Sequence, residues 1–424
     1  MANTVYIVSA VRTPIGKFGG MLMDFTQPDL SVIAVRAALE RAFGLPLPPE
    51  RTPGQSATAG APSLPWRVDE LIFGNARPAG IGPNPARQIA WRAGLGDDVP
   101  AFTVNAACAS GLRSVVLAWQ QIVLGEAHIM VAGGGEAMSR VPYLLDARWG
   151  YKMGHQQISD AMYRDGFVCP MSKLIMGETA EILATEYKIP REEQDAYALE
   201  SHRRATSAGV EGRFKAEIVP IEKTDKKGAV TRLEKDEHVR SDVTLENLTK
   251  LAPVFSKTGT VTAGNSSGLT DGAAAVVLAS EQKVRELKLQ PLVRIVDATV
   301  TAVDPRVMGI GPVPAVRKLV ERTRTKLEDY AAVELNEAFA AQILACDRDL
   351  HFNRQRLNPN GGAIALGHPI ACTGARILTT LVHEIRQPSS GNGGQKAASV
   401  AGRRGLATLC VSGGLGVAVE IETV

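Results

Sequence analysis

Residues 102–135, with the sequence FTVNAACASGLRSVVLAWQQIVLGEAHIMVAGGG, decide the fold class of this chain. The stretch opens with a strand-like run at 102–105 and closes with another at 127–132. Between them, apolar residues recur at helical spacing, and Gly125 suits the end of a helix. These apolar residues are Leu112, Val115, Val116, Trp119, Ile122 and Val123. The stretch therefore predicts a strand, a helix and a second strand in succession.

The same alternation extends towards both ends of the chain. Runs at 5–11 and 70–73 predict further strands, and the residues after 291 return to a strand–helix pattern. The run Val419 to Glu422 predicts a final strand. Such alternation is typical of α/β folds made of strand–helix–strand units.

Charge and pattern divide the chain into three regions. The first, 1–138, has the strand–helix alternation, and we expect it to be completed by about 264–290. The middle region, 139–263, is richer in charge and weaker in strand pattern, and it holds the polar stretch 222–240. It predicts an inserted, lid-like domain. The third region, 291–424, repeats the alternation of the first.

A weak internal repeat links the first and third regions. The segment 108–113, CASGLR, opens a predicted helix that is followed by a strand and the glycines at 133–135. The segment 371–376, ACTGAR, does the same and ends at 412–414. Either Gly-rich turns coincide here by chance, or two similar half-folds meet at a shared site.

Composition excludes several classes of protein. Of the 424 residues, 45% are hydrophobic and 21% are charged, which is a normal globular balance for more than one domain. The formal net charge of +3 is too small to indicate nucleic-acid binding. No apolar run reaches about 18 residues, so we expect no membrane insertion. We expect no signal peptide before the first strand.

The cysteines indicate a reducing compartment. There are five, at positions 108, 169, 346, 372 and 410, and no two form a CxxC pair. This pattern disfavours both a disulfide framework and a structural zinc site, so we expect no metal and a cytoplasmic location. Residues 52–65 and 388–402 are rich in Pro, Gly, Ser and Ala and predict surface insertions.

Two residues far apart in the sequence are candidates for thiol chemistry. Cys108 lies where a strand-like run meets a helix, and a helix start favours a thiolate. The alternative is a buried structural cysteine. His368 lies in the segment 361–369, GGAIALGHP, whose glycines indicate close backbone approach. The alternative is a packed histidine in a turn. A Cys and a His from distant positions form a common nucleophile pair.

Two further positions are less informative on their own. Cys410 lies near the end of the apolar run 406–411 and precedes the segment 412–414, SGG, which is typical of a core cysteine. Asn336 and Glu337 follow the run 331–335 and resemble an ordinary helix start.

Together, these segments resemble the motifs of the thiolase family. Residues 105–111, NAACASG, resemble its nucleophile motif, and 336–339, NEAF, match its NEAF motif. Residues 367–369, GHP, and 410–414, CVSGG, resemble its GHP and C-terminal CxGGG motifs. Further similar segments are 12–14, 176–181, 264–268 and 308–314. The resemblance spans nearly the whole chain, with four catalytic motifs in the family's order.

The resemblance implies a fold and a reaction. The fold would have duplicated βαβαβαββ halves in a five-layered α-β-α-β-α core, with an inserted loop domain that binds coenzyme A. The reaction would be reversible Claisen condensation of two acyl-CoA, expected to be two acetyl-CoA, or thiolytic cleavage of 3-ketoacyl-CoA. Coenzyme A and acyl-CoA would be substrates, with no permanent cofactor. The enzyme would be a homodimer or homotetramer, and fatty acid metabolism would be its context.

The resemblance also implies residue roles. Cys108 would carry the acyl group, His368 would take its proton, and Cys410 would remove the Cα proton of the second substrate. Asn336 would hold a water in the enolate hole, while the backbone N–H groups of Cys108 and Ser412 would form the second oxyanion hole. Residues expected to touch the substrate are Ser267, Arg240 and Met176.

The chain departs from the family motifs at two positions. Ala371 replaces the glycine that usually follows GHP-x, and Ser412 replaces the first glycine after Cys-x. Each adds a side chain near the expected site, and activity is expected to persist because the role at 412 belongs to a backbone N–H. Two alternatives are another condensing enzyme of this fold, which would lack the second cysteine, Cys410, and a non-catalytic acyl-CoA-binding relative.

Overall fold

The computed structural model describes residues 3–54, 64–224, 227–387 and 400–424. Most of the two predicted insertions, 52–65 and 388–402, lies outside the described residues.

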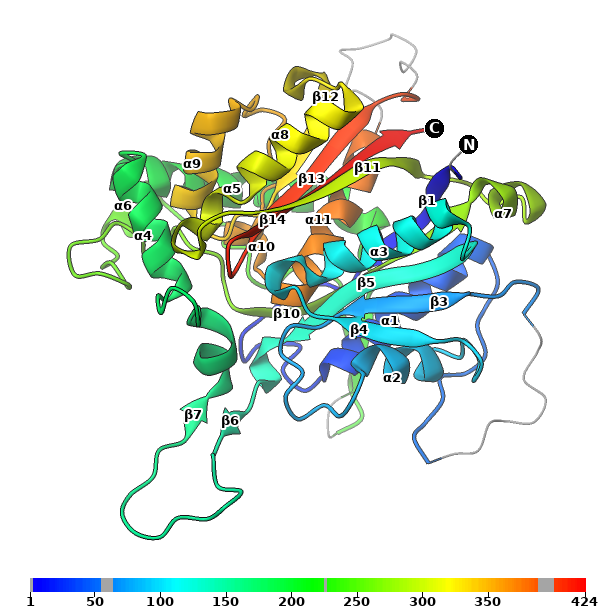
Figure 1. The fold of residues 1–424 in the computed structure, drawn as a ribbon, viewed down its shortest axis with the longest axis horizontal. Helices are drawn as coiled ribbons and strands as arrows, with labels where there is room; N and C mark the ends of the chain where they lie inside the picture. Colours follow the sequence, from blue (N-terminus) through cyan, green and yellow to red (C-terminus); the bar gives the residue numbers. More distant parts are fainter. Residues whose placement is uncertain (1–2, 55–63, 225–226, 388–399) are drawn as a thin grey trace.

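One mixed sheet runs through the molecule, and it consists of two half-sheets (Figure 1). The strand order is β12-β13-β14-β11-β1-β10-β5-β3-β4, with β2 paired to β10. Strands β1 and β11 meet through only two residue pairs, whereas their other neighbours pair along most of each strand. The strands are β1 (Val5–Arg12), β2 (Gly16–Lys17), β3 (Glu70–Gly74), β4 (Ala101–Val104), β5 (Ile129–Ala137), β10 (Thr270–Ser280), β11 (Val293–Ala302), β12 (Tyr330–Leu335), β13 (Arg404–Val411) and β14 (Leu415–Thr423).

Helices cover and separate the half-sheets. The helices are α1 (Gln27–Phe43), α2 (Pro85–Arg92), α3 (Ser110–Leu124), α4 (Met176–Glu186), α5 (Arg191–Val210), α6 (Leu245–Thr249), α7 (Glu281–Glu286), α8 (Pro312–Thr323), α9 (Ala340–Leu350), α10 (Ala363–Leu366) and α11 (Ile370–Ile385). Figure 1 shows α1 and α2 at one end of the stack and α8 and α9 at the other. Helices α3 and α11 share one core cluster with strands of both half-sheets. The expected α-β-α-β-α layering is therefore confirmed.

The quoted stretch folds as predicted. Strand β4, helix α3 and strand β5 follow one another, and α3 ends at Gly125, which takes the left-handed backbone that glycine favours. By length and composition, Ala107–Leu124 is the one described helical stretch that could cross a membrane, and half of it is buried. It is α3 with its preceding turn, packed between the half-sheets, so its apolar character is that of a core helix.

The two copies of the repeat touch where α3 and α11 begin. A Cβ added to Gly111 would lie 2.6 Å from the carbonyl oxygen of Ala371, and one added to Gly374 would lie 2.6 Å from the backbone nitrogen of Leu112. Gly111 and Gly374 occupy equivalent places in the repeat. The two helix starts can approach this closely because neither glycine has a side chain. This contact brings the motif after β4 beside the GHP motif.

The middle region contributes α4, α5, α6 and two short hairpins. The hairpins are β6 (Tyr143–Leu144) with β7 (Ser159–Asp160), and β8 (Ile221–Thr224) with β9 (Val230–Leu233). The β6–β7 segment projects from the body as a long arm (Figure 1). Trp149 and Met153 on this arm are 94% and 92% exposed. Exposed apolar side chains gathered on one projection are typical of a surface that meets another protein.

Candidate active site

Cys108 lies in a strained turn between β4 and α3. A single 3-10 turn, Ala107–Ala109, precedes the helix, and Ala107 has a positive φ of 46°, which is uncommon for a residue with a side chain. The Ala107 N–H donates to Asn105 Oδ1 at 3.0 Å, and the Ser110 hydroxyl donates to the Ala107 carbonyl at 2.7 Å. These hydrogen bonds hold the strained turn and fix the position of Cys108.

The thiol of Cys108 is protonated in the empty pocket. Burial raises its pKa, while the Ser412 N–H, the charge of Arg77 and its own N–H oppose this effect. The expectation that the helix start favours a thiolate is therefore wrong for the resting site, because the lost hydration of the charged form outweighs these groups.

Close packing of the preceding glycine and one hydrogen bond to the ring fix the position of His368. Gly367 before it has φ 99°, and a Cβ there would lie 2.3 Å from Thr270 Cγ2. His368 Nδ1 lies 2.6 Å from Thr373 Oγ1, and that hydroxyl donates to the Pro369 carbonyl at 3.1 Å. A hydroxyl has only one proton, so Nδ1–H must donate to Thr373 Oγ1. Nε2 is then left with its lone pair.

The imidazole of His368 is neutral near pH 7. Burial lowers its pKa to about 3, and the nearby charges of Arg376 and Arg77 act in the same direction. A neutral ring with a free Nε2 can accept a proton, which is the state a general base needs.

Cys410 ends β13, and the turn after it explains one departure from the family motif. Burial raises the pKa of Cys410 well above its usual value, and Cys108 adds to the effect. Gly413 and Gly414 have φ values of 89° and 84°, which disfavour side chains, but Ser412 has no positive φ. A serine is therefore tolerated at 412, and its N–H still reaches the Cys108 sulfur.

One pocket of about 460 Å³ brings most of the predicted residues together. Its lining includes Cys108, His368, Cys410, Ser412, Ser267 and Met176. Asn336, in contrast, is not among the residues that line this pocket, and it is 1% exposed. Among the described residues, neither polar atom of its amide has a hydrogen-bond partner. Such an amide suits a role in binding a small polar group.

Comparison with known families agrees with this arrangement. Residues 54–282 match the family described as "Thiolase, N-terminal domain", and residues 289–423 match "Thiolase, C-terminal domain". The chain belongs to the thiolase family.

Full-length relatives agree. A Cupriavidus necator protein named acetyl-CoA acetyltransferase is 44% identical over 99% of both chains. The solved Bacillus anthracis acetyl-CoA acetyltransferase has a TM-score of 0.89 and 42% identity, covering 100% of this chain and 99% of that one. Human mitochondrial 3-ketoacyl-CoA thiolase in complex with CoA has a TM-score of 0.87 and 40% identity, with coverage of 100% and 99%. This thiolase is therefore an acyltransferase.

Arg240 does not lie in the pocket of this thiolase. Its side chain is exposed, and its backbone N–H donates to His202 Nδ1 at 3.3 Å. His238, two residues earlier, does line the pocket, with Nδ1 3.0 Å from the Ala365 carbonyl. A role for Arg240 is thus limited to a ligand that extends beyond the pocket.

Glu136, a buried residue, was not predicted from the sequence. Its carboxylate accepts hydrogen bonds from the N–H groups of Ala76, Arg77 and Ala371, and so joins the segment that follows β3 to the first turn of α11. Burial is the main reason that its pKa is raised to about 7. The available signal was a single acid inside the apolar and Gly-rich run of β5.

The sequence analysis also missed the role of Glu337, inside the NEAF motif. Its carboxylate accepts from the Tyr197 and Ser201 hydroxyls at 2.9 and 2.7 Å and from the Ile364 N–H at 3.1 Å. It therefore ties the loop after β12 to α5 and to the helical turn before His368. We infer that Glu337 positions the neighbouring Asn336.

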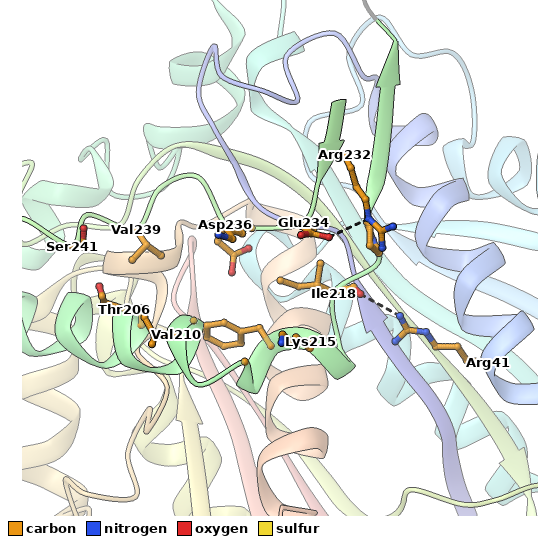
Figure 2. A pocket seen from close by; sticks show the side chains of 16 residues that line it. Arg41, Thr206, Val210, Lys215, Ile218, Arg232, Glu234, Asp236, Val239 and Ser241 are labelled. Carbon is orange, nitrogen blue, oxygen red and sulfur yellow. Dashed lines mark hydrogen bonds and ion pairs between the residues drawn. The ribbon is translucent and has the colours of Figure 1, made fainter. Parts of the chain in front are cut away.

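A larger pocket of about 760 Å³ lies elsewhere, between α5, the β8–β9 hairpin and Arg41 of α1 (Figure 2). Neither cysteine nor histidine lines it. Arg41 donates to the Ile218 carbonyl, and Arg232 pairs with Glu234. Among the described residues, this pocket therefore lacks the Cys–His pair on which the thiolase reaction depends.

Proposed function

We propose that the chain forms or cleaves a carbon–carbon bond in short 3-ketoacyl-CoA thioesters through an acyl-Cys108 intermediate. The two-acetyl-CoA condensation, giving acetoacetyl-CoA and CoA, is the proposed physiological example. The observation that carries this proposal is the presence of Cys108, Cys410 and His368 around one pocket. Similarity to proteins named acetyl-CoA acetyltransferase supports the substrate.

The first half of the reaction loads Cys108. Its sulfur attacks the thioester carbonyl carbon while its proton passes to His368 Nε2. Both groups are neutral in the resting pocket, so the proton transfer accompanies the attack rather than preceding it. The tetrahedral oxyanion binds to the N–H groups of Cys108 and Ser412, and each such donor contributes about 3 kcal/mol. Cys410 gives its proton to the departing coenzyme A thiolate, so the acyl-enzyme forms with His368 protonated and Cys410 as a thiolate.

The second half forms the new bond. The Cys410 thiolate removes a Cα proton from the second acetyl thioester, and the enolate carbon attacks the acyl group on Cys108. The Nε2–H of protonated His368 and a water held by Asn336 stabilise the enolate oxygen. The sulfur of Cys108 then leaves and regains its proton from His368, giving acetoacetyl-CoA. The buried and unpartnered amide of Asn336 supports that role.

Coenzyme A binds against the middle region. Ser267 and Met176 line the pocket, and we propose that they contact the pantetheine arm and the acyl group. We propose that Arg240 contacts the adenine end, outside the pocket. Coenzyme A and acyl-CoA are substrates, with no permanent cofactor and no metal.

We also propose the division into halves 1–138 with 264–290, and 291–424, around the loop domain 139–263. Pairing of β10 with β1 and β5 supports the first grouping. The exposed arm and the edge strand β4 support assembly into a homodimer or homotetramer. The free cysteines support a cytoplasmic location.

A labelling experiment tests the proposal. Incubation with acetyl-CoA alone adds one acetyl group to Cys108, detected by peptide mass spectrometry, and Cys108→Ala abolishes it. A label on Cys372 or Cys410 instead would contradict the assignment. A protein that binds CoA but never acquires a label would be the non-catalytic relative. Acylation without any condensation would favour another condensing enzyme.

A further inference from the structure

Arg77 is a buried cation in the active-site pocket that the reaction described above does not use. It follows β3 and lines the same pocket as Cys108. Its side chain is 8% exposed, and the backbone of Gly166 lies directly against its guanidinium. A Cβ at Gly166 would lie 2.5 Å from Arg77 Nη2, so even alanine would displace the guanidinium.

The guanidinium is poorly satisfied by the protein itself. Nη1 donates to the Ala76 carbonyl at 3.0 Å, and Nε has no hydrogen-bond partner in the part of the chain that the structure describes. Within the same residues it forms no ion pair. The charges of Arg77 and the nearby Glu136 attract each other, but the Glu136 carboxylate accepts its hydrogen bonds from backbone N–H groups and from Asn75. Burying a cation without a hydrogen-bonded anion is costly, so Arg77 suits an anion that arrives with the ligand.

Part of the pocket lining next to Cys108 is apolar. Met138 and Ile370 line the pocket and belong to one hydrophobic cluster, against which Cys108 and Phe167 pack. The methylene groups of an acyl chain attached to Cys108 would thus contact apolar side chains, and the guanidinium of Arg77 would lie in the same pocket. Its five donors match both oxygens of a carboxylate.

We propose that Arg77 binds a carboxylate at the far end of the acyl chain, and that, in thiolysis of substrates longer than acetoacetyl-CoA, short 3-oxoacyl-CoA thioesters of dicarboxylic acids are preferred to uncharged ones of the same length. This inference rests on the proposed function and specifies its substrate class. In thiolysis, Cys108 attacks the 3-keto carbon, and the bond from that carbon to Cα breaks. The Cα carbanion takes a proton from Cys410 and leaves as acetyl-CoA. The thiol of a second coenzyme A then displaces the carboxylated acyl group from Cys108.

The test compares two substrates of equal length. We would measure kcat/KM for thiolysis of the six-carbon 3-oxo dicarboxylic acyl-CoA and of 3-oxohexanoyl-CoA, which has a methyl group in place of the carboxylate. We expect the unmodified enzyme to prefer the dicarboxylic substrate by at least 100-fold. We expect Arg77→Met to reduce that ratio to near 1 or below, and Arg77→Lys to give an intermediate ratio. Arg67→Met, which removes an exposed arginine paired with Asp98, should keep the original ratio.

Two results would overturn the inference. One is an unmodified enzyme that shows no preference or prefers 3-oxohexanoyl-CoA. The other is an Arg77→Met variant that loses rate equally on both substrates, because Arg77 would then act on Cys108 or on folding. Failure of the proposed function itself looks different: acetoacetyl-CoA would not be cleaved and Cys108 would not be acylated.

Discussion

At the residue scale, the pocket keeps two thiols and an imidazole neutral until a substrate arrives. Burial raises the pKa of Cys108 and Cys410 and lowers that of His368. Cys108 and Cys410 therefore start as proton donors and His368 as a proton acceptor, and Cys410 can act as a base only after it has given its proton to the departing coenzyme A. The charges of the reaction would appear only next to fixed N–H donors, which need no reorganisation.

The two thiols should be separable by mutation. Cys410→Ala is expected to form acetyl-Cys108 normally but to lose at least about 100-fold in condensation, the usual scale of a positioned acid–base group. Acylation needs a nucleophile and His368, whereas condensation also needs Cα proton removal. Mass spectrometry and a condensation assay measure the two steps. Condensation at near the original rate would make Cys410 a structural residue.

Thr373 is expected to act through His368. Thr373→Val removes the acceptor for His368 Nδ1–H, leaving a buried donor that costs about 1–3 kcal/mol and no longer fixes the tautomer. We expect kcat to fall about 10- to 100-fold, with KM changing less. Thr373→Ser keeps the hydroxyl and should restore most of the rate. Equal losses in both variants would show that the methyl group, not the hydroxyl, matters.

Glu136 should make stability depend on pH. Its folded pKa of about 7 lies above the ordinary value of 4.5. Between those two pH values, Glu136 keeps its proton in the folded state but has lost it in the unfolded chain. The contribution of Glu136 to the free energy of unfolding is therefore complete below pH 4.5 and is lost as the pH rises through 7. The melting temperature of the unmodified protein relative to Glu136→Gln should therefore fall across this range, by the equivalent of about 3 kcal/mol. A pH-independent difference would contradict the shift.

At the scale of elements, the contact between α3 and α11 holds the site together. Gly374→Ala would place a methyl group 2.6 Å from the backbone nitrogen of Leu112, which cannot move alone. We expect destabilisation of about 1–3 kcal/mol or more, together with lost activity, because Cys108 and His368 lie beside the two helix starts. Thermal melting measures the first effect.

Gly209→Ala is the matched control. Gly209 lies in α5, and an added Cβ would meet nothing within 4 Å. Alanine is the better helix former, so this variant should melt at the same temperature or slightly higher. If Gly374→Ala behaved like the control, the close approach of α3 and α11 would not limit stability.

At the scale of the whole molecule, the exposed arm is the surface most suited to assembly. Replacing Trp149 and Met153 together by serine removes its two most exposed apolar side chains. We expect a smaller assembly by analytical ultracentrifugation. Acylation of Cys108 should change only a few-fold, because neither residue lines the pocket. An unchanged mass would place the interface elsewhere, for example along the edge strand β4.

The sequence predicted local features well because they have local causes. Strands β3, β4 and β5 and helix α3 follow from periodicity and one terminal glycine, and the four motifs marked the residues around the pocket. Long-range electrostatics were not predictable in this way. The buried Glu136 and Arg77 gain their character from neighbours that are distant in sequence, and burial reversed the thiolate expected at Cys108. Arg240 matched a motif position, yet its side chain lies on the surface.

The contact between α3 and α11 also shows how two similar halves of one chain can come to differ in their residues. Where the two helix starts touch, both copies have glycine, at Gly111 and Gly374. A side chain at either position would collide with the backbone of the other copy. Three positions earlier the copies have diverged to Cys108 and Ala371, since one reactive sulfur suffices. Close contact between the copies thus requires the same residue at Gly111 and Gly374. The site needs only one nucleophile, so the equivalent positions Cys108 and Ala371 can differ. An asymmetric catalyst thus arises from a nearly symmetric frame, and neither half holds a complete site.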